Sequence, residues 1–219
     1  MDFQHFLEYV PHFAQAKLPA MEAHLKMAPF ERMESLKNAF SENKDPRMAA
    51  VMMLFYPKNG MTHLVLIVRN AYEGVHSGQI AFPGGKWETE DEDFSATALR
   101  ETHEEVGIRP SQMEIIKLFT PTYIPPSNFM VYPYLGICKE EVCFVLDPTE
   151  VSRIIELPLS VFLSDKIIIE AKLTTSYAKN ISVPAFDIDG HVVWGATAMM
   201  LSELKDVLKS VLEVEKKLG

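Results

Sequence analysis

The sequence predicts an α/β (α+β) protein in which a sheet of short strands is layered with helices and preceded by a helical extension. Three observations support this class. Short apolar runs separated by proline and glycine turns fill the middle of the chain, an amphipathic helix follows a glycine-rich break, and a long amphipathic helix closes the chain. We therefore expect a helical N-terminal extension over residues 1–45 and a single main domain over residues 46–219.

The composition excludes several classes of function. The 219 residues carry 21 Lys+Arg and 30 Asp+Glu, a formal net charge of −9, so a general role in binding nucleic acid is disfavoured. With 47% hydrophobic and 23% charged residues, the chain has the composition of an ordinary folded domain.

We expect neither a membrane span nor a secretory signal in this sequence. Its longest apolar run, residues 49–56, is far shorter than the roughly 20 residues of a membrane span, so no membrane partner is expected. The N-terminus begins with an acidic residue, Asp2, where a secretory signal would be basic. Only Cys138 and Cys143 are present, so we expect no disulfide framework and a cytoplasmic location.

The N-terminal extension is predicted as short helices. Pro11, Pro19 and Pro29 are expected to break the helical pattern into pieces. The methionine-rich residues 21–33 could form a partner surface, but packing against the main domain is the favoured interpretation. The apolar stripe of the first piece consists of Phe3, Phe6, Leu7 and Val10.

The main domain is predicted to open with a β-hairpin. Residues 49–56 and 62–69 are apolar runs separated by a proline-and-glycine turn at residues 57–60. A helix is expected over residues 94–106, ended by Gly107 as a C-cap. Further strands are expected over residues 79–82, 114–120, 129–137, 151–157, 166–173, 181–186 and 191–194, with a final helix over 196–218.

Three acidic residues share one face of the first long helix. At about 100° per residue, Glu105 lies roughly 40° from Glu101, and Glu104 roughly 60° to its other side. Carboxylates this close raise one another's pKa values, so their ionisation calls for a compensating cation. Oxygen ligands suit Mg²⁺ or Mn²⁺. We expect this face to point outward, opposite an arc that contains Ala98 and Val106.

The residues next to the acids favour a site over a merely solvated helix face. Arg100 can pair with Glu104 one turn along the helix. Gly84 and Gly85, read as a turn after a strand, leave the backbone open, so that a carbonyl could complete a metal site or an amide could face a phosphate. A glycine turn, an acidic loop and RExxEExG in this order are rare by chance.

These motifs resemble the box of the Nudix hydrolase family, GX5EX7REUXEEXGU, where U is a bulky aliphatic residue. Arg100, the three glutamates, Gly107 and Ile108 fall on its positions. The loop before Arg100 is one residue longer than in the box, so the preceding acid is Asp91 when counted from Gly85 and Glu92 when counted from Arg100. Thr102 stands at the first aliphatic position.

The longer loop resembles the coenzyme A diphosphatase subgroup of this family. FPGG at residues 82–85 and TALRE at residues 97–101 are the subgroup's motifs. The subgroup also has an upstream signature, LLTXR(S/A)X3RX3GX3FPGG, and Arg69 and Gly78 keep its spacing. Asn70 and Gly74 depart from that signature, and Gly74 stands where an arginine is expected. Later segments also resemble the subgroup, so that the resemblance spans about residues 47–212. These segments are residues 132–134, 149–151, 157–159 and 193–198.

The resemblance implies an α/β/α sandwich with a mixed β-sheet, plus the helical extension. It implies a small nucleotide substrate, with Mg²⁺- or Mn²⁺-dependent cleavage of the coenzyme A pyrophosphate to 4′-phosphopantetheine and adenosine 3′,5′-bisphosphate. Glu101 and Glu105 are then the expected metal ligands, Glu104 a further ligand or a neighbour of one, and the carbonyl of Gly85 or Gly84 the backbone contribution.

Further roles are less specific. Glu101 is the first candidate for the general base and Glu150, in a distal loop, is the second. Arg69 is expected either to bind a phosphate or to form a structural ion pair. Ser127 and Asn128 could line the pocket, although such loop residues are more often turn formers.

Two other functions stay open. The first is a Nudix hydrolase acting on ADP-ribose or NADH, favoured if Gly74 reflects a changed phosphate pocket. The second is a non-catalytic module that only binds a nucleotide, which has no need to keep three mutually repelling carboxylates. The sequence leaves the oligomeric state open, with a homodimer as one possibility.

Overall fold

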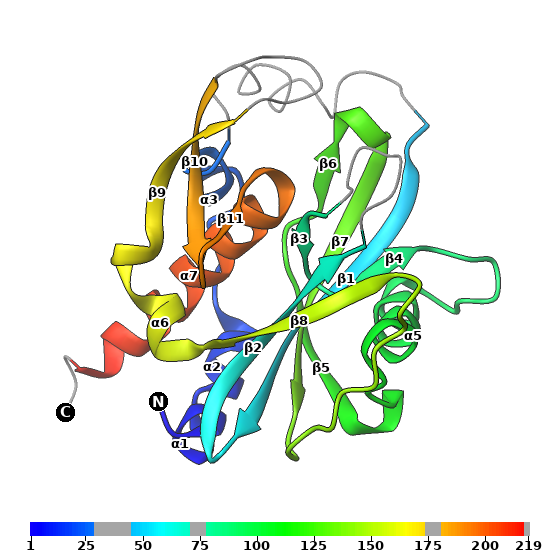
Figure 1. The fold of residues 1–219 in the computed structure, drawn as a ribbon. Coiled ribbons are helices and arrows are strands. Elements are labelled where there is room, and N and C mark those ends of the chain that lie inside the picture. Colours follow the sequence, from blue (N-terminus) through cyan, green and yellow to red (C-terminus); the bar gives the residue numbers. More distant parts are fainter. Residues whose placement is uncertain (29–44, 71–77, 174–180, 217–219) are drawn as a thin grey trace.

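Figure 1 shows the computed structural model, which describes residues 1–28, 45–70, 78–173 and 181–216. An eight-stranded sheet is covered by helices on both faces, and a three-stranded sheet lies beside it. This arrangement confirms the α/β fold expected from the sequence.

The large sheet is mixed. Strands β1 (Arg47–Lys58) and β7 (Phe129–Cys138) run parallel, while the other pairs in this sheet are antiparallel. The order is β3-β2-β1-β7-β5, with β4 also pairing β1, β6 pairing β7 and β8 pairing β2. The remaining strands are β2 (Met61–Arg69), β3 (Ile80–Ala81), β4 (Gly84–Lys86), β5 (Met113–Leu118), β6 (Thr122–Ile124) and β8 (Val151–Pro158).

The predicted hairpin of β1 and β2 is confirmed, but its turn is shorter than expected. Pro57 and Lys58 pair with β2, so only two residues connect the strands. These are Asn59 and Gly60, with φ of 49° and 71°. Positive φ at both positions matches the twist of the strands, and asparagine and glycine tolerate it best.

Alternate side chains of β1 pack into two separate hydrophobic cores, one on each face of the sheet. Met52 and Leu54 pack on the face covered by α5 (Phe94–Val106), whereas Met53 and Phe55 pack on the opposite face. That second face is covered by α1 (Phe3–Glu8), α2 (Val10–Gln15) and α7 (Gly195–Lys216). The layers form an α/β/α sandwich.

The N-terminal helices contribute to the core of the second face. Phe3, Phe6 and Phe13 are fully buried, and α3 (Met21–Leu25) packs against α7. The extension consists of short helices, as expected, and Pro11 lies in the first turn of α2, where a missing N–H costs nothing, so the second piece starts there. Pro29 and the end of the methionine-rich segment lie outside the described residues.

The small sheet is antiparallel and is ordered β11-β10-β9. Its strands are β9 (Ile168–Leu173), β10 (Ile181–Ile188) and β11 (His191–Val193), and the predicted β10–β11 hairpin is confirmed. The sequence did not predict β4, β6 or α6 (Leu159–Leu163), nor the 3₁₀ turns η2 (Pro110–Gln112), η3 (Pro125–Ser127) and η4 (Asp165–Ile167).

Helix α5 has the predicted bounds. Asp93 caps its N-terminus by accepting a hydrogen bond from the Ala96 amide at 2.9 Å. Gly107 ends it in the left-handed conformation, with φ of 80°. Among the described helices, none is long and apolar enough to span a membrane. Cys138 is buried and Cys143 exposed, both with free thiols.

Candidate active site

The site is built where α5 packs against β4. Gly84 pairs with Val51 of β1, and its amide donates a hydrogen bond to Oε2 of Glu105 at 2.7 Å. A Cβ on Gly84 would lie 2.3 Å from the carbonyl oxygen of Ala50, and the residue has φ of 148°. Only glycine fits here. The two glycines are therefore part of a strand, not the turn that the sequence suggested.

Glu105 points into the protein, so the expectation of three outward-facing acids is wrong for this residue. It is 1% exposed because α5 packs directly on the sheet, where the Gly84 amide supplies a partner for the carboxylate. Burial raises its pKa to about 8, with Arg69 opposing the shift. Among the described residues, its Oε1 has no hydrogen-bond partner. A buried carboxylate oxygen without a donor favours a cation beside it.

Glu101 lies directly over Gly85. A Cβ on Gly85 would come within 2.4 Å of Oε2 and 2.6 Å of Oε1 of Glu101. The glycine therefore leaves the space that this carboxylate occupies. Burial also raises the pKa of Glu101, against the lowering effect of Arg100.

Arg100 holds the acids of the loop and the helix together. Its Nε and Nη2 bind the two oxygens of Asp91 at 2.8 and 2.9 Å, and its Nη1 binds Glu101 and Glu104, each at 2.9 Å. The predicted pair with Glu104 is confirmed. The Arg100 hydrogen bonds lower the pKa of Asp91 to about 2.

The hydrogen bonds of Arg100 show which of the two loop acids, Asp91 or Glu92, belongs to the site. Asp91 binds the guanidinium, whereas Glu92 is exposed to solvent. The Lys86 carbonyl also accepts a hydrogen bond from Nη2 of Arg100, at 3.0 Å. The sequence does not reveal this contact, because every residue has a backbone carbonyl whatever its side chain.

Arg69, at the end of β2, forms an ion pair with Glu105. Its Nη1 is 3.5 Å from Oε1 of Glu105, and its side chain is 26% exposed. The structural ion pair considered from the sequence is thus present. The guanidinium also remains partly accessible to an anion.

Glu150 belongs to the same electrostatic environment. It is exposed, and its carbonyl accepts a hydrogen bond from the Asn70 amide, next to Arg69, at 2.9 Å. Its charge contributes to the raised pKa values of both Glu101 and Glu105. The fold therefore brings this distal loop acid toward the helix acids.

Ser127 and Asn128 belong to the connection between β6 and β7. The Ser127 carbonyl accepts a hydrogen bond from Arg47 at 2.7 Å, and Asn128 adopts φ of 51°. The Asn128 side chain donates to the Asp45 carbonyl and accepts from the Tyr123 hydroxyl. Asn128 is thus a turn former, and the contacts of Ser127 are to the turn and β1, not to the acids. Gly74 lies outside the described residues.

The donor set suits a hard divalent cation. Within the described part of the chain, no three His, Cys, Asp or Glu side chains already converge as metal ligands, and Arg100 binds both Glu101 and Glu104. Two observations nevertheless fit a cation: Oε1 of Glu105 accepts no hydrogen bond from the described residues and lies 3.5 Å from Nη1 of Arg69, and the carboxylate of Glu101 lies against the backbone of Gly85. Oxygen donors alone match Mg²⁺ or Mn²⁺.

A mixed-sheet sandwich with an acidic helix packed over a double-glycine strand defines a Nudix-type domain. The model of the NUDIX domain matches residues 46–173, more than half of the chain. The chain therefore belongs to the Nudix hydrolase family.

Several relatives are similar in sequence over much of the chain. An uncharacterized Nudix hydrolase, NudL, of Enterobacter sp. is 31% identical over 180 residues, covering 79% of this chain and 89% of the relative. Mouse peroxisomal coenzyme A diphosphatase NUDT7 is 31% identical, covering 58% of this chain and 53% of the relative. The chain spans 53% and 44% of two Arabidopsis relatives, chloroplastic Nudix hydrolase 22 and mitochondrial Nudix hydrolase 15.

Solved structures support the fold. RenU, a Nudix hydrolase from M. smegmatis, superposes with a TM-score of 0.52 at 15% identity, covering 75% of this chain and 87% of RenU. A MutT/nudix family protein from Enterococcus faecalis gives 0.51 at 17% identity, covering 84% of this chain and 75% of that protein. The cytoplasmic location and the homodimer stay predictions.

Proposed function

We propose that this protein is a metal-dependent pyrophosphohydrolase that cleaves the pyrophosphate of coenzyme A or a derivative of it. The observation that carries the proposal is the pairing of Glu101 and Glu105 with the glycine strand. Glu105 offers a buried oxygen without a hydrogen-bond partner, and Glu101 lies against the bare backbone of Gly85.

Glu101 and Glu105 would hold the divalent ion, with the Gly85 carbonyl as the backbone ligand. Glu104, whose side chain is 54% exposed and is bound by Arg100, would be a further ligand or a neighbour of one. When bound, Mg²⁺ or Mn²⁺ neutralises the adjacent negative charges of a phosphoanhydride, which otherwise repel the attacking water.

The chain's own residues supply the remaining functions. Arg100, fixed by Asp91, holds the directions of Glu101 and Glu104. Arg69 is partly exposed beside Glu105 and can bind a phosphate oxygen. Glu101, or Glu150 from the distal loop, accepts the proton of the attacking water.

Coenzyme A is the proposed substrate for two reasons. FPGG at residues 82–85 and TALRE at residues 97–101 resemble the coenzyme A diphosphatase subgroup. One relative, at 31% identity, carries the name of coenzyme A diphosphatase. The second candidate is a hydrolase of ADP-ribose or NADH, which is favoured if Gly74, at a position where the subgroup has an arginine, reflects a changed phosphate pocket.

A substrate panel tests the proposal. The purified full chain is incubated with coenzyme A, its oxidised and acylated forms, ADP-ribose or NADH, each with Mg²⁺ or Mn²⁺, and the products are separated by chromatography. We expect 4′-phosphopantetheine, or its acylated or disulfide form, and adenosine 3′,5′-bisphosphate to form from the coenzyme A compounds at the highest kcat/KM. Preferred cleavage of ADP-ribose or NADH would support the second candidate, and binding without turnover would indicate a non-catalytic module.

A further inference from the structure

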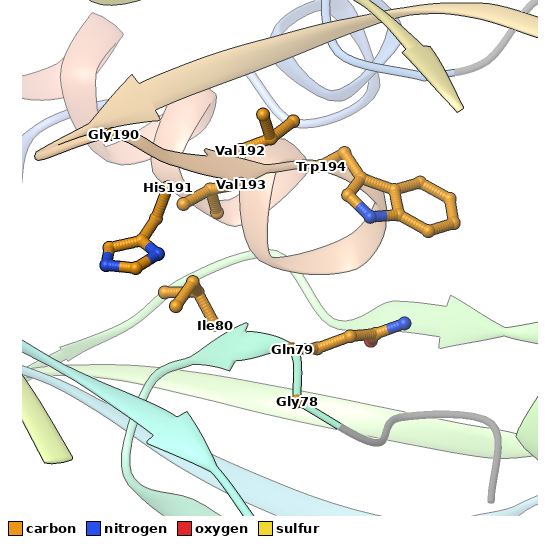
Figure 2. A pocket seen from close by; sticks show the side chains of 8 residues that line it. All are labelled: Gly78, Gln79, Ile80, Gly190, His191, Val192, Val193 and Trp194. Carbon is orange, nitrogen blue, oxygen red and sulfur yellow. The ribbon is translucent and has the colours of Figure 1, made fainter. Parts of the chain in front are cut away.

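A pocket lies between β3 and the β10–β11 hairpin (Figure 2). None of the described residues of the acidic site line this pocket. Its volume is about 230 Å³. This is below the usual range for a complete ligand of drug size, so the pocket suits one fragment of a larger molecule. The lining residues come from two segments, Gly78–Ile80 and Gly190–Trp194.

Trp194 provides the aromatic surface of this pocket. Part of its side chain packs against the small apolar cluster of Ala171, Val183 and Ala185 in β9 and β10. Trp194 also lines the pocket, and Figure 2 shows its indole on the same side as the side chain of Gln79. A planar group that enters the pocket there would contact an indole ring whose position is fixed by its packing against this cluster.

The two walls of the pocket are fixed relative to each other. The Thr197 hydroxyl, in the first turn of α7, donates a hydrogen bond to the Ile80 carbonyl of β3 at 3.0 Å. Trp194 directly precedes this helix, and β11 is paired to β10. The pocket is therefore preformed, which reduces the entropy cost of binding.

The pocket adjoins the acidic site through a single arginine. The Arg69 amide donates a hydrogen bond to the carbonyl of Gln79, a pocket residue, at 3.1 Å. The Arg69 side chain reaches Glu105. Arg69 therefore contacts the acidic site through its side chain and the wall of the pocket through its backbone.

One edge of the pocket carries positive charge. The guanidinium of Arg153, on β8, contacts the imidazole of His191. His191 lines the pocket at the end away from Trp194 (Figure 2). A charged guanidinium there favours a phosphorylated ligand.

We infer that this pocket receives the aromatic base of the nucleotide half of the substrate, stacked on Trp194. The inference rests on the proposed function, because it takes the substrate to be a nucleoside diphosphate derivative. Coenzyme A, ADP-ribose and NADH all carry adenine, so the assignment holds for both candidate substrate classes. Stacking on an aromatic side chain accepts any base and contributes substantially to its binding.

Fluorescence tests the inference without metal or turnover. The chain has two tryptophans, so a Trp87→Phe variant leaves Trp194 as the sole indole. Titration of this variant with adenosine 5′-monophosphate is expected to quench its emission, whereas ribose 5-phosphate, which lacks the base, has no effect. Unchanged emission with adenosine 5′-monophosphate, or equal quenching by ribose 5-phosphate, would overturn the assignment.

Kinetics with coenzyme A provide the second readout. Trp194→Ala is expected to raise KM roughly tenfold at similar kcat, and Trp194→Phe to restore most of the affinity. Circular dichroism checks that each variant is folded. A KM unchanged in folded Trp194→Ala would contradict the inference. Quenching by the nucleotide in a chain that hydrolyses no substrate would support the base pocket while refuting the proposed function.

Discussion

Glu105 shows how one buried carboxylate sets the properties of this site. Its charge is opposed by burial, and Arg69 and the Gly84 amide offset that penalty only in part. The folded chain keeps a proton on Glu105 up to about pH 8, whereas an ordinary glutamate loses it near pH 4.5. The stability that this protonated form contributes is complete below pH 4.5 and is lost as the pH rises through 8.

Replacing Glu105 with glutamine should therefore stabilise the metal-free protein at alkaline pH. Glutamine mimics the protonated acid and keeps an acceptor for the Gly84 amide. At pH 9 without divalent ions, we expect the variant to exceed the wild type by about 2 kcal/mol in the free energy of unfolding. At pH 4 the difference should nearly vanish. Urea titrations at both pH values measure it, and a difference independent of pH would contradict the assigned pKa.

At the residue scale, the sequence predicted which side chains share a helix face but not which of them are buried. The helical period places Glu101, Glu104 and Glu105 together. The burial of Glu105 depends on the Gly84 amide, 21 positions earlier in the chain. Helical periodicity within α5 carries no information about that partner.

Strand β4 and helix α5 act as one unit in this site. The backbone of Gly85 and the carboxylate of Glu101 leave no room for a side chain between them. A methyl group on Gly85 must push the carboxylate away from its position. The spacing between these two elements is therefore a functional constraint.

Gly85→Ala should reduce turnover much more than stability. A displacement of the Glu101 carboxylate by about 1 Å is expected to lower kcat roughly 100-fold. Gly60→Ala is the matched control, because Gly60 lies in the β1–β2 turn with φ of 71° and should lose about 1 kcal/mol of stability at unchanged kcat. Normal kcat in a folded Gly85→Ala protein would show that Glu101 is not a ligand at this position.

At the element scale, prediction succeeded where several signals agreed. The bounds of α5 follow from Asp93 as N-cap, an amphipathic stripe and Gly107 as C-cap. Strand β4 was missed because consecutive glycines usually mark a turn, and its pairing with β1 is a long-range contact. The three-residue strand β6 is too short to show alternation.

The whole molecule depends on its N-terminal helices. Phe3 and Phe6 of α1 and Phe13 of α2 form part of the core on the face of the sheet opposite α5. Phe6→Ala is expected to lower the free energy of unfolding by about 3–5 kcal/mol, because it leaves a cavity. Val161→Ala, at a position 41% exposed, should change it by less than about 1 kcal/mol. Equal effects in urea titrations would mean that the extension does not stabilise the domain.

Glu203 connects the extension to the rest of the fold from the middle of α7. It is fully buried and accepts hydrogen bonds from the Ala20 amide and from the amide and hydroxyl of Thr120, with His24 at 3.4 Å. Burial opposes its ionisation, but the interactions with His24 and Thr120 prevail and lower its pKa. The stability it contributes is present above its ordinary pKa and is lost as the pH falls.

Glu203→Gln should destabilise the protein at pH 7 by about 2 kcal/mol, and less at acid pH where the wild-type carboxyl is protonated. Asp206→Asn is the control, because Asp206 pairs with Lys26 in a more exposed position on the same helix and should matter little. Thermal melts of the three proteins from pH 3 to 7 provide the measurement. A loss in Glu203→Gln that does not shrink toward acid pH would contradict the role of the charge.

At the scale of the whole molecule, the sequence predicted the fold class and the approximate order of elements. It could not predict the parallel pairing of β1 with β7, whose partners are about 80 positions apart. Glu203 stands among Met199, Leu204 and Val207 on the apolar side of α7, so an acid in an apolar stripe was the available signal for the buried contact.

The central claim is that Glu101 and Glu105 hold divalent ions over a phosphoanhydride. Its most direct test is the rate of coenzyme A hydrolysis as a function of Mg²⁺ concentration, for the wild type and for Glu101→Gln and Glu105→Gln, with the fold of each checked by circular dichroism. We expect Mg²⁺-dependent turnover in the wild type and a loss of several orders of magnitude in both variants. Near-normal turnover by both folded variants would contradict the account.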